Sequence, residues 1–117
     1  MDLLERVTMH LRQGLGSVPV SASAPSDRKS LNEFVTVSRA GGTRSLFLDG
    51  PRVLADCHAT SIADSYALAE VVADLLTHMP EFDPMVSEAG PCSLYRNEWT
   101  EDGTPCHSVS CPMVVNI

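Results

Sequence analysis

The sequence predicts one α+β domain over residues 1–117, built as a mainly antiparallel sheet with two helices packed on one face. Two segments carry apolar residues at helical spacing, and several others alternate apolar and polar residues as strands do. Their order is helix, short strand, long loop, β-ribbon, helix and β-hairpin. A chain of 117 residues is long enough for one such domain with its own core.

The first helix is predicted over residues 2–15, with Asp2 at the end that favours a negative charge. Its apolar residues recur at spacings of three and four: Leu3, Leu4, Val7, Leu11 and Leu15. Gly14 and Gly16 are expected to stop this helix.

A short strand is predicted at Val18 and Val20, before an exposed loop over residues 21–31. The loop is rich in Ser and Ala and contains Pro25. A loop of this length is unusual in a compact domain, which indicates a binding role.

A β-ribbon is predicted over residues 33–59, beginning with a strand at 33–39. Gly41-Gly42 and Asp49-Gly50-Pro51 each predict a turn. Residues 52–59 alternate, which predicts a strand with one buried face. The face expected to be buried holds Val53, Ala55, Cys57 and Ala59, and the opposite face holds Arg52, Asp56 and His58.

The second helix is predicted over residues 62–78, with Ser61 as its N-cap and Pro80 at its end. Its apolar stripe is wide, as expected of a helix that lies across a sheet. The stripe consists of Ile62, Tyr66, Ala69, Val72, Ala73 and Leu76, widened by Leu68, Val71 and Leu75.

The last third predicts a hairpin of residues 85–96 and 106–117, with a turn at 101–103. Gly90-Pro91 is expected to bend the first strand. Pro112 has no N–H group to donate, so it is expected at a sheet edge or at a locally unpaired position.

Composition excludes several function classes. The charge is −7, and the basic residues are scattered, which argues against a nucleic-acid binder or a membrane-surface protein. No secretory signal or membrane-spanning run is found, so we expect the chain to stay in a reducing cytoplasm with its four cysteines as free thiols.

The cysteines and histidines do not predict a metal site or a cofactor site. Cys106 and Cys111 should lie on opposite faces of one strand, so they should not converge on a metal. Cys57 and Cys111 are interpreted as small apolar core residues. A nucleophile pair of Cys57 with His78 or His107 stays open, because such residues meet only in the folded chain.

Two stretches resemble one known family. The strand from Asp49 to Ala59, which leads into the helix from Ser61 to Ala69, and the residues 90–115 are similar to tail terminator proteins of long-tailed, siphovirus-type phages, especially those of actinobacterial hosts. The resemblance covers roughly residues 30–117. His58 replaces a frequent aromatic residue, often Trp, and Cys106-His107 replaces a more usual arginine–aromatic pair.

The resemblance implies a structural virion protein of the same α+β fold, not an enzyme, which is made in the host cytoplasm and resides in the tail or neck. It implies a ring, usually a hexamer, on the head-proximal end of the tail tube. Such a ring stops tube-protein polymerisation and offers a surface to head-completion and connector proteins. Genomic DNA would pass through an acidic lumen without specific binding.

A closed ring needs two different complementary patches on each subunit. Trp99, the only tryptophan, is expected either to cover the core or to anchor an interface. The other candidate contacts with the ring or tube are Asp27, Arg28, Lys29, Arg39, Arg44 and Arg52. Two alternatives remain: another neck protein such as a head–tail stopper, or a small Cys/His-dependent enzyme or binding module.

Overall fold

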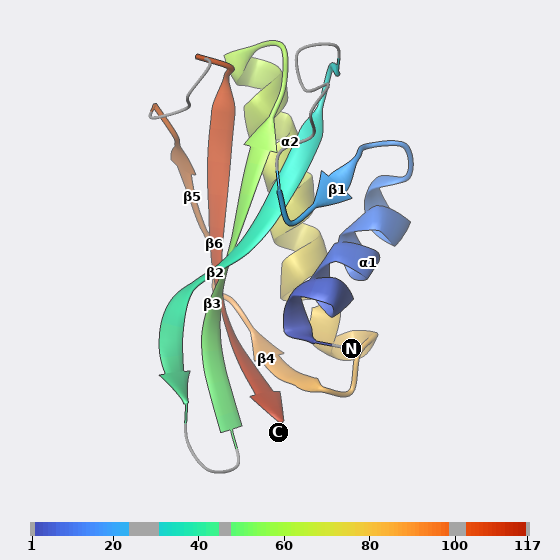
Figure 1. The fold of residues 1–117 in the computed structure, drawn as a ribbon, viewed down its shortest axis with the longest axis vertical. Coiled ribbons are helices and arrows are strands. Elements are labelled where there is room, and N and C mark those ends of the chain that lie inside the picture. Colours follow the sequence, from blue (N-terminus) through green and yellow to red (C-terminus); the bar gives the residue numbers. More distant parts are fainter. Residues whose placement is uncertain (1, 24–30, 45–47, 99–102, 117) are drawn as a thin grey trace.

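The computed structural model of the chain describes residues 2–23, 31–44, 48–98 and 103–116 (Figure 1). Within these ranges the chain forms one mixed sheet and two α-helices, which confirms the α+β class. The elements in order are α1 (Leu3–Leu15), β1 (Val20–Ser21), β2 (Phe34–Arg44), β3 (Leu48–His58), α2 (Ile62–Thr77), the 3-10 helix η2 (Met79–Glu81), β4 (Val86–Ala89), β5 (Ser93–Arg96) and β6 (Cys106–Asn116).

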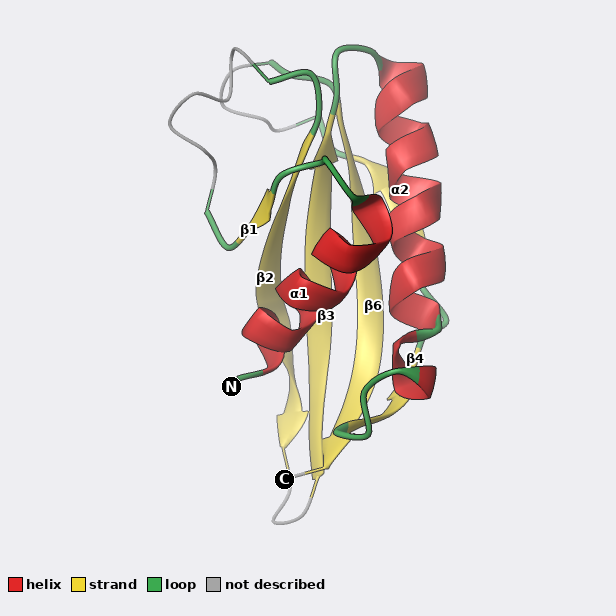
Figure 2. Ribbon diagram, turned by 90° about the vertical axis from the view of Figure 1, so that its right-hand side faces the viewer, coloured by secondary structure: helices red, strands yellow, loops and turns green. Residues whose placement is uncertain are grey.

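The strands run in the order β1-β2-β3-β6-β4, and β5 pairs with the same edge of β6 as β4 does. All these pairings are antiparallel except that of β1 with β2. Figure 2 shows both helices on one side of the sheet, as the sequence predicts. The other side of the sheet carries no helix among the described residues.

Both helices begin where their capping residues predict. The Asp2 carboxylate accepts a hydrogen bond from the Glu5 N–H at 2.8 Å, and the Ser61 hydroxyl accepts one from the Asp64 N–H at 3.1 Å. These bonds satisfy amide groups that have no partner inside the first turn. Gly16 ends α1 with a φ of 67°, which glycine adopts without strain.

Gly14 does not stop α1, contrary to the expectation. It lies inside the helix, where an added Cβ would come within 2.5 Å of a Leu75 methyl group on α2. The absent side chain therefore lets the two helices approach closely. Packing between distant segments decides the role of this glycine, and the local sequence carries no sign of it.

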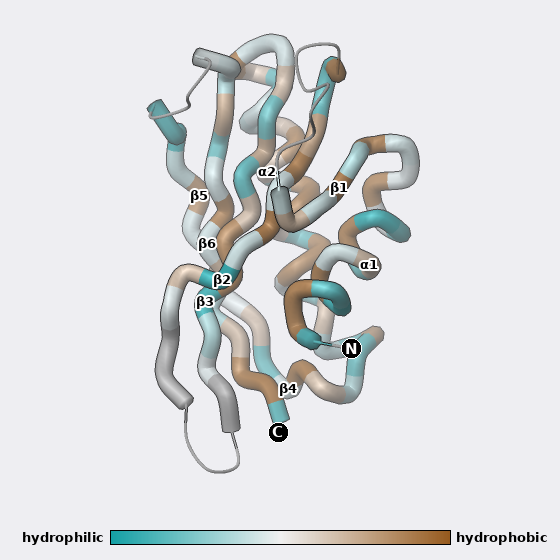
Figure 3. Tube along the Cα trace, in the orientation of Figure 1, coloured by the Kyte–Doolittle hydropathy of each residue, from teal (hydrophilic) through white to brown (hydrophobic). Residues whose placement is uncertain are grey.

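The core lies between the sheet and the two helices. The alternation predicted for residues 52–59 is confirmed, since Val53, Ala55 and Cys57 are fully buried. The same alternation of apolar and polar residues can be followed along β3 and β6 in Figure 3. Each large aliphatic side chain buried here contributes roughly 1.5–3 kcal/mol to folding. The helices contribute Val7, Leu11, Leu68, Ala69, Val72, Ala73 and Leu76 to this core.

The predicted stripe of α2 is right at its centre and wrong at both margins, since Val71 on the other margin is 47% exposed as well. Ala69, Val72 and Leu76 are buried, but Ile62 and Tyr66 are 46% and 47% exposed. The helix meets the sheet along a line that includes Ser65 and Leu68 instead. The polar Ser65 is fully buried because it has hydrogen-bond partners inside.

The predicted turns in the ribbon are wrong. Gly41-Gly42 lies inside β2, where the pairing with β3 shifts register between Arg39 and Gly42. Gly41 has a φ of 91°, so the glycines form a bulge instead of a turn. Asp49-Gly50-Pro51 lies inside β3. The connection between the strands falls on residues 45–47, which lie outside the described residues.

The bend at Gly90-Pro91 divides the predicted strand 85–96 into β4 and β5. Both then pair with β6, which is a central strand and not an edge. Pro112 falls on β6 between the last partner of β5, Ser110, and the first partner of β4, Met113. Toward β4 and β5 this proline has no ladder partner, and its carbonyl accepts the Gly90 N–H at 2.8 Å. On its other side it pairs with Arg52 of β3, so the expected unpaired position is present on one side only. The turn at 101–103 lies outside the described residues except for Gly103.

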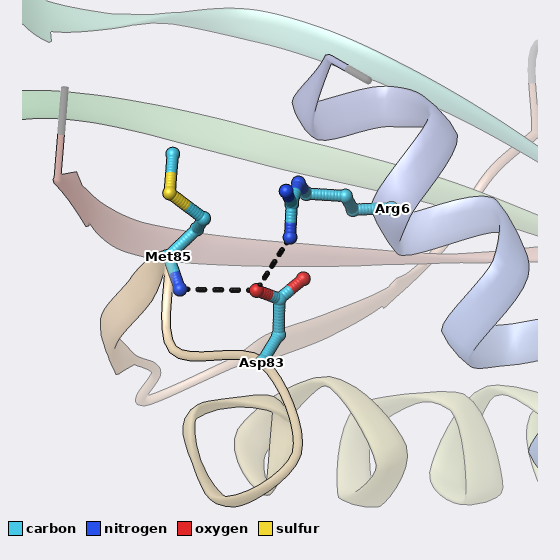
Figure 4. Close-up of polar contacts among 3 residues, drawn as sticks. All are labelled: Arg6, Asp83 and Met85. Atoms are coloured by element: carbon cyan, nitrogen blue, oxygen red, sulfur yellow. Dashed lines mark hydrogen bonds and ion pairs between the residues drawn. The ribbon is translucent and has the colours of Figure 1, made fainter.

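An ion pair fastens α1 to the turn after η2 (Figure 4). Arg6 Nη1 donates to Asp83 Oδ1 at 2.8 Å, and the same oxygen accepts the Met85 N–H at 3.0 Å. The side chains of Arg6 and Asp83 are 31% and 14% exposed. This partly buried pair therefore joins α1, the first helix of the layer, to the turn after η2, the last.

Candidate interaction surfaces

The face of the sheet away from the helices carries several polar side chains and no helix among the described residues. Cross-strand pairs share a face, so the register places Asp56 beside Ser108 and Leu54 beside Ser110. This open face, as it is called below, is formed by alternate residues of the three central strands. They are Phe34, Thr36 and Ser38 of β2, Arg52, Leu54, Asp56 and His58 of β3, and Cys106, Ser108 and Ser110 of β6.

A chain of hydrogen bonds joins β3, β6 and the residue that follows β5 on the open face. The Ser108 hydroxyl donates to Asp56 Oδ1 at 2.6 Å, and Asn97 Nδ2 donates to the Ser108 oxygen at 3.3 Å. Ser108 is fully buried although no helix covers it. Tyr95 lies opposite Ser108 on β5, so its ring is in a position to cover this serine. The hydroxyl is therefore held as a structural partner of the carboxylate.

A second polar contact lies farther along the same face. Arg52 Nη1 donates to Ser110 Oγ at 3.0 Å, although the backbone partner of Arg52 is Pro112. The guanidinium therefore reaches diagonally across β6 and remains exposed. A guanidinium group has five N–H donors, so most of its capacity stays available to another molecule.

The far end of the open face holds an imidazole against an aromatic ring. His58 stacks on Phe34, with ring centroids 4.3 Å apart and an interplanar angle of 8°. On its other side, Cys106 Sγ lies 3.7 Å from His58 Nε2. Cys106 and His58 are cross-strand partners. The sheet therefore brings the His of the adjacent pair Cys57-His58 next to the Cys of the adjacent pair Cys106-His107.

The helix-facing side holds a separate serine–histidine contact. Ser65 Oγ lies 2.7 Å from His107 Nδ1 and donates to the Ile62 carbonyl at 2.9 Å. The Tyr66 ring meets the imidazole edge-on at 5.4 Å. Burial lowers the pKa of His107, and the nearby Arg96 charge lowers it further. His107 is therefore neutral at pH 7, and it donates from Nδ1 because the serine hydrogen points to Ile62.

Cys57 lies directly opposite His107 on β3, so the structure brings together one of the two pairs left open by the sequence. Cys57 is fully buried in the core. Burial raises the pKa of the Cys57 thiol far above its ordinary value, and nearby Cys106 and Asp56 raise it further. The thiolate is the nucleophilic form, so this thiol is inert at neutral pH.

The structure separates the candidate contact residues of the ribbon. Arg39 pairs with Val53 and shares the helix-facing side of the sheet, whereas Arg52 lies on the open face. The backbone of Arg44 pairs with Asp49 near the end of the ribbon. Asp27, Arg28, Lys29 and Trp99, together with most of the predicted loop 21–31, lie outside the described residues.

The two outer edges of the sheet differ. On one side, β2 runs from Phe34 to Arg44, and among the described residues its outer edge pairs with the short β1 at Val35 and Thr36 alone. On the other side, the edge is formed by two short strands, β4 and β5, placed end to end along β6. The ribbon of β2 and β3 extends beyond the helical layer in both views (Figures 1 and 2).

Sequence reasoning did not find the polar partners Ser108, Asn97 and Ser65. Each lies in an unremarkable polar position, and its partner is 11 to 52 residues away in the sequence. The only available signal was alternation, which places Ser108 and Asp56 on the outward faces of two strands. It does not reveal that these strands are neighbours.

No group of three or more His, Cys, Asp or Glu side chains within the described ranges is arranged to hold a metal ion. No helix in the described part of the chain is long and apolar enough to cross a bilayer. No protein family model matches the sequence, and no curated protein matches it.

Proposed function

We propose that this chain is a tail terminator of a long-tailed phage, a structural protein that forms a ring and has no catalytic role. In this role the ring, six copies by the family resemblance, sits on the head-proximal end of the tail tube. There it stops addition of tube protein and joins the tail to the head-completion proteins. The resemblance of residues 49–69 and 90–115 supplies the family, and the fold supplies the surfaces.

The observation that carries the proposal is the pair of unlike open edges on one sheet. A closed ring repeats a head-to-tail contact, so each subunit needs two different patches that fit each other. Among the described residues, the long edge of β2 and the divided edge of β4 and β5 are two different surfaces at opposite edges of the sheet, as such a contact requires. Strand edges associate through backbone hydrogen bonds, so edge groups that are not used between neighbouring subunits can cap a tube.

The polar groups of the described residues support a structural role. Asp56 and Ser108 bind each other, and Ser65 and His107 bind each other. Ser108 and Ser65 are both fully buried, so neither hydroxyl is accessible to a substrate. The Cys57 thiol beside His107 is protonated and buried. Each group thus serves a neighbour in the fold.

Charge supports the passage of DNA through such a ring. The chain carries −7, so a ring of identical copies repels the phosphate backbone on average. Binding would require clustered Lys or Arg to displace counterions. The two arginines with described surroundings on the ribbon, Arg39 and Arg52, lie on opposite faces and form no such cluster.

The test is tube assembly in vitro with the major tube protein of the same phage. Tubes polymerised with this chain present should be short and carry a ring at one end in electron micrographs. The charge reversals Arg39→Glu and Arg52→Glu should restore unrestricted growth, whereas Glu70→Lys on the exposed side of α2 should not. Unchanged tube length with no ring at either end would refute the proposal. Binding to the portal-side ring alone would show a stopper instead.

A further inference from the structure

We propose that Cys92 and Cys111 form a thiol–disulfide exchange site that takes small-molecule disulfides as its substrate and closes to an internal disulfide. The pairing of β5 with β6 runs from Arg96 with His107 to Ser93 with Ser110. Extended by one position beyond β5, that register would place Cys92 opposite Cys111, and the two thiols interact with each other. This inference does not depend on the ring.

The geometry suits a disulfide bond. Directly opposed residues of antiparallel strands have Cα atoms about 4.5–5.5 Å apart, within the range of about 4.4–6.8 Å that disulfides span. Both side chains also turn to the same side of the sheet. Cys111 belongs to the core between sheet and helices, and Cys92 packs against that core. The Cys92 thiol donates to the Ala73 carbonyl of α2 at 3.8 Å.

The two thiols differ in access. Cys111 is fully buried, whereas Cys92 is partly exposed and lies at the bend between β4 and β5. The Thr77 hydroxyl donates to the Ala73 carbonyl at 2.7 Å and lies 3.5 Å from Cys92 Sγ, so it can donate to the sulfur only by turning away from Ala73. A small disulfide can therefore meet Cys92 first, with Cys111 already in place behind it.

The electrostatic surroundings favour the same division of roles. A hydrogen bond from Cys111 lowers the pKa of Cys92 below the ordinary thiol value, and Thr77 adds to this against the opposing effect of burial. The same hydrogen bond raises the pKa of Cys111, together with its burial. Charged groups near the pair are Asp74 of α2 and Arg52 of β3. Cys92 is thus the attacking thiolate and Cys111 the resolving thiol.

The exchange balances in two steps. The Cys92 thiolate attacks one sulfur of a disulfide RS–SR, the S–S bond breaks and one RS⁻ leaves with the proton released by Cys92. Cys111 then gives its proton to the solvent and attacks Cys92 Sγ, and the second RS⁻ leaves and takes up a proton. The two protein thiols are oxidised, and one small disulfide is reduced to two thiols.

Oxidised glutathione is the probe, with acid quench, alkylation of the remaining thiols and peptide mass mapping. The wild type should lose two of its four thiols and show one bond between the Cys92 and Cys111 peptides, without a lasting adduct. Its melting temperature should rise by roughly 10 °C, because the bond closes a loop of about 20 residues. The matched control Cys106→Ala should behave like the wild type.

Two variants separate the roles. Cys111→Ala should hold a stable glutathione adduct on Cys92, because the resolving thiol is missing. Cys92→Ser should leave the other three thiols unmodified, because the attacking thiol is missing. This variant replaces a partly exposed residue, so it still tests the proposal if the core variant Cys111→Ala does not fold. Four free thiols in the oxidised wild type, a persistent adduct there, or a bond between other cysteines would overturn the proposal.

Discussion

The two faces of the sheet use the same strands in different ways. Toward the helices, β3 and β6 present Val53, Ala55, Val109 and Cys111, all fully buried. Toward the other side, the same strands present Asp56, Ser108 and Arg52 in cross-strand hydrogen bonds. The helix-facing side accounts for most of the apolar burial, and the open face leaves polar groups and two sheet edges near solvent. The apolar core therefore lies on one face of the sheet, and a network of polar contacts, with Ser108 fully buried in it, lies on the other.

The largest expected effect is on the helix-facing side. Leu76→Ala should lower the free energy of unfolding by about 2–5 kcal/mol, because Leu76 is fully buried in α2 and leaves a cavity. Urea unfolding measures this. Val71→Ala, at a position 47% exposed on the same helix, should cost less than about 0.5 kcal/mol. Equal losses in the two variants would contradict the assigned face of α2.

The next effect belongs to the open face. Ser108→Ala should lower the free energy of unfolding by roughly 1–3 kcal/mol, because Asp56 loses a donor and Asn97 an acceptor at a buried position. Ser93→Ala on β5 is the control, since that serine is exposed. If both variants have the urea midpoint of the wild type, the hydrogen bonds of Ser108 with Asp56 and Asn97 do not stabilise the fold.

A smaller effect is expected at the junction of the helical layer. Asp83→Asn should cost about 1 kcal/mol, because it removes the charge opposite Arg6 while an amide oxygen can still accept the Met85 N–H. The difference from wild type should shrink in 1 M salt, where exposed charges are screened. A difference that does not change with salt would show that the charge of this pair contributes nothing.

The smallest effect concerns pH. Burial lowers the pKa of His107 in the folded chain, so the unfolded chain takes up this proton first as the pH falls below about 6.5. The free energy of unfolding should therefore fall with decreasing pH in that window and be unaffected by this group above it. His107→Gln should weaken that dependence when urea midpoints at pH 5 and 7.5 are compared. A steeper slope in the variant would mean that the sign is wrong.

The sequence predicted what local chemistry decides. Asp2 and Ser61 cap their helices, and the alternation through Val53, Ala55 and Cys57 marks the buried face of β3, because each feature depends on neighbours within a few residues. Glycine and proline in the ribbon misled the prediction. Gly50 and Pro51 pair with Thr43 and Gly42 of β2, and the residues on either side of them pair with β6, so both stay inside a strand despite their preference for turns.

The candidate surfaces were less predictable. Arg39 and Arg52 belong to one ribbon, but the strand register puts them on opposite faces. The facing of Cys92 and Cys111 depends on the register of β5 with β6, and nothing in their spacing reveals it. Contacts between distant segments have no local signature, so only the folded chain shows them.

Native mass spectrometry of the purified chain over rising concentration tests most directly whether the open edges serve contacts between copies. We expect one closed species of several copies. The double variant Arg39→Glu with Arg52→Glu should return this species to monomer while the urea midpoint stays within the wild-type range. A chain that remains monomeric at every concentration, alone and with tube protein present, would contradict the proposed ring.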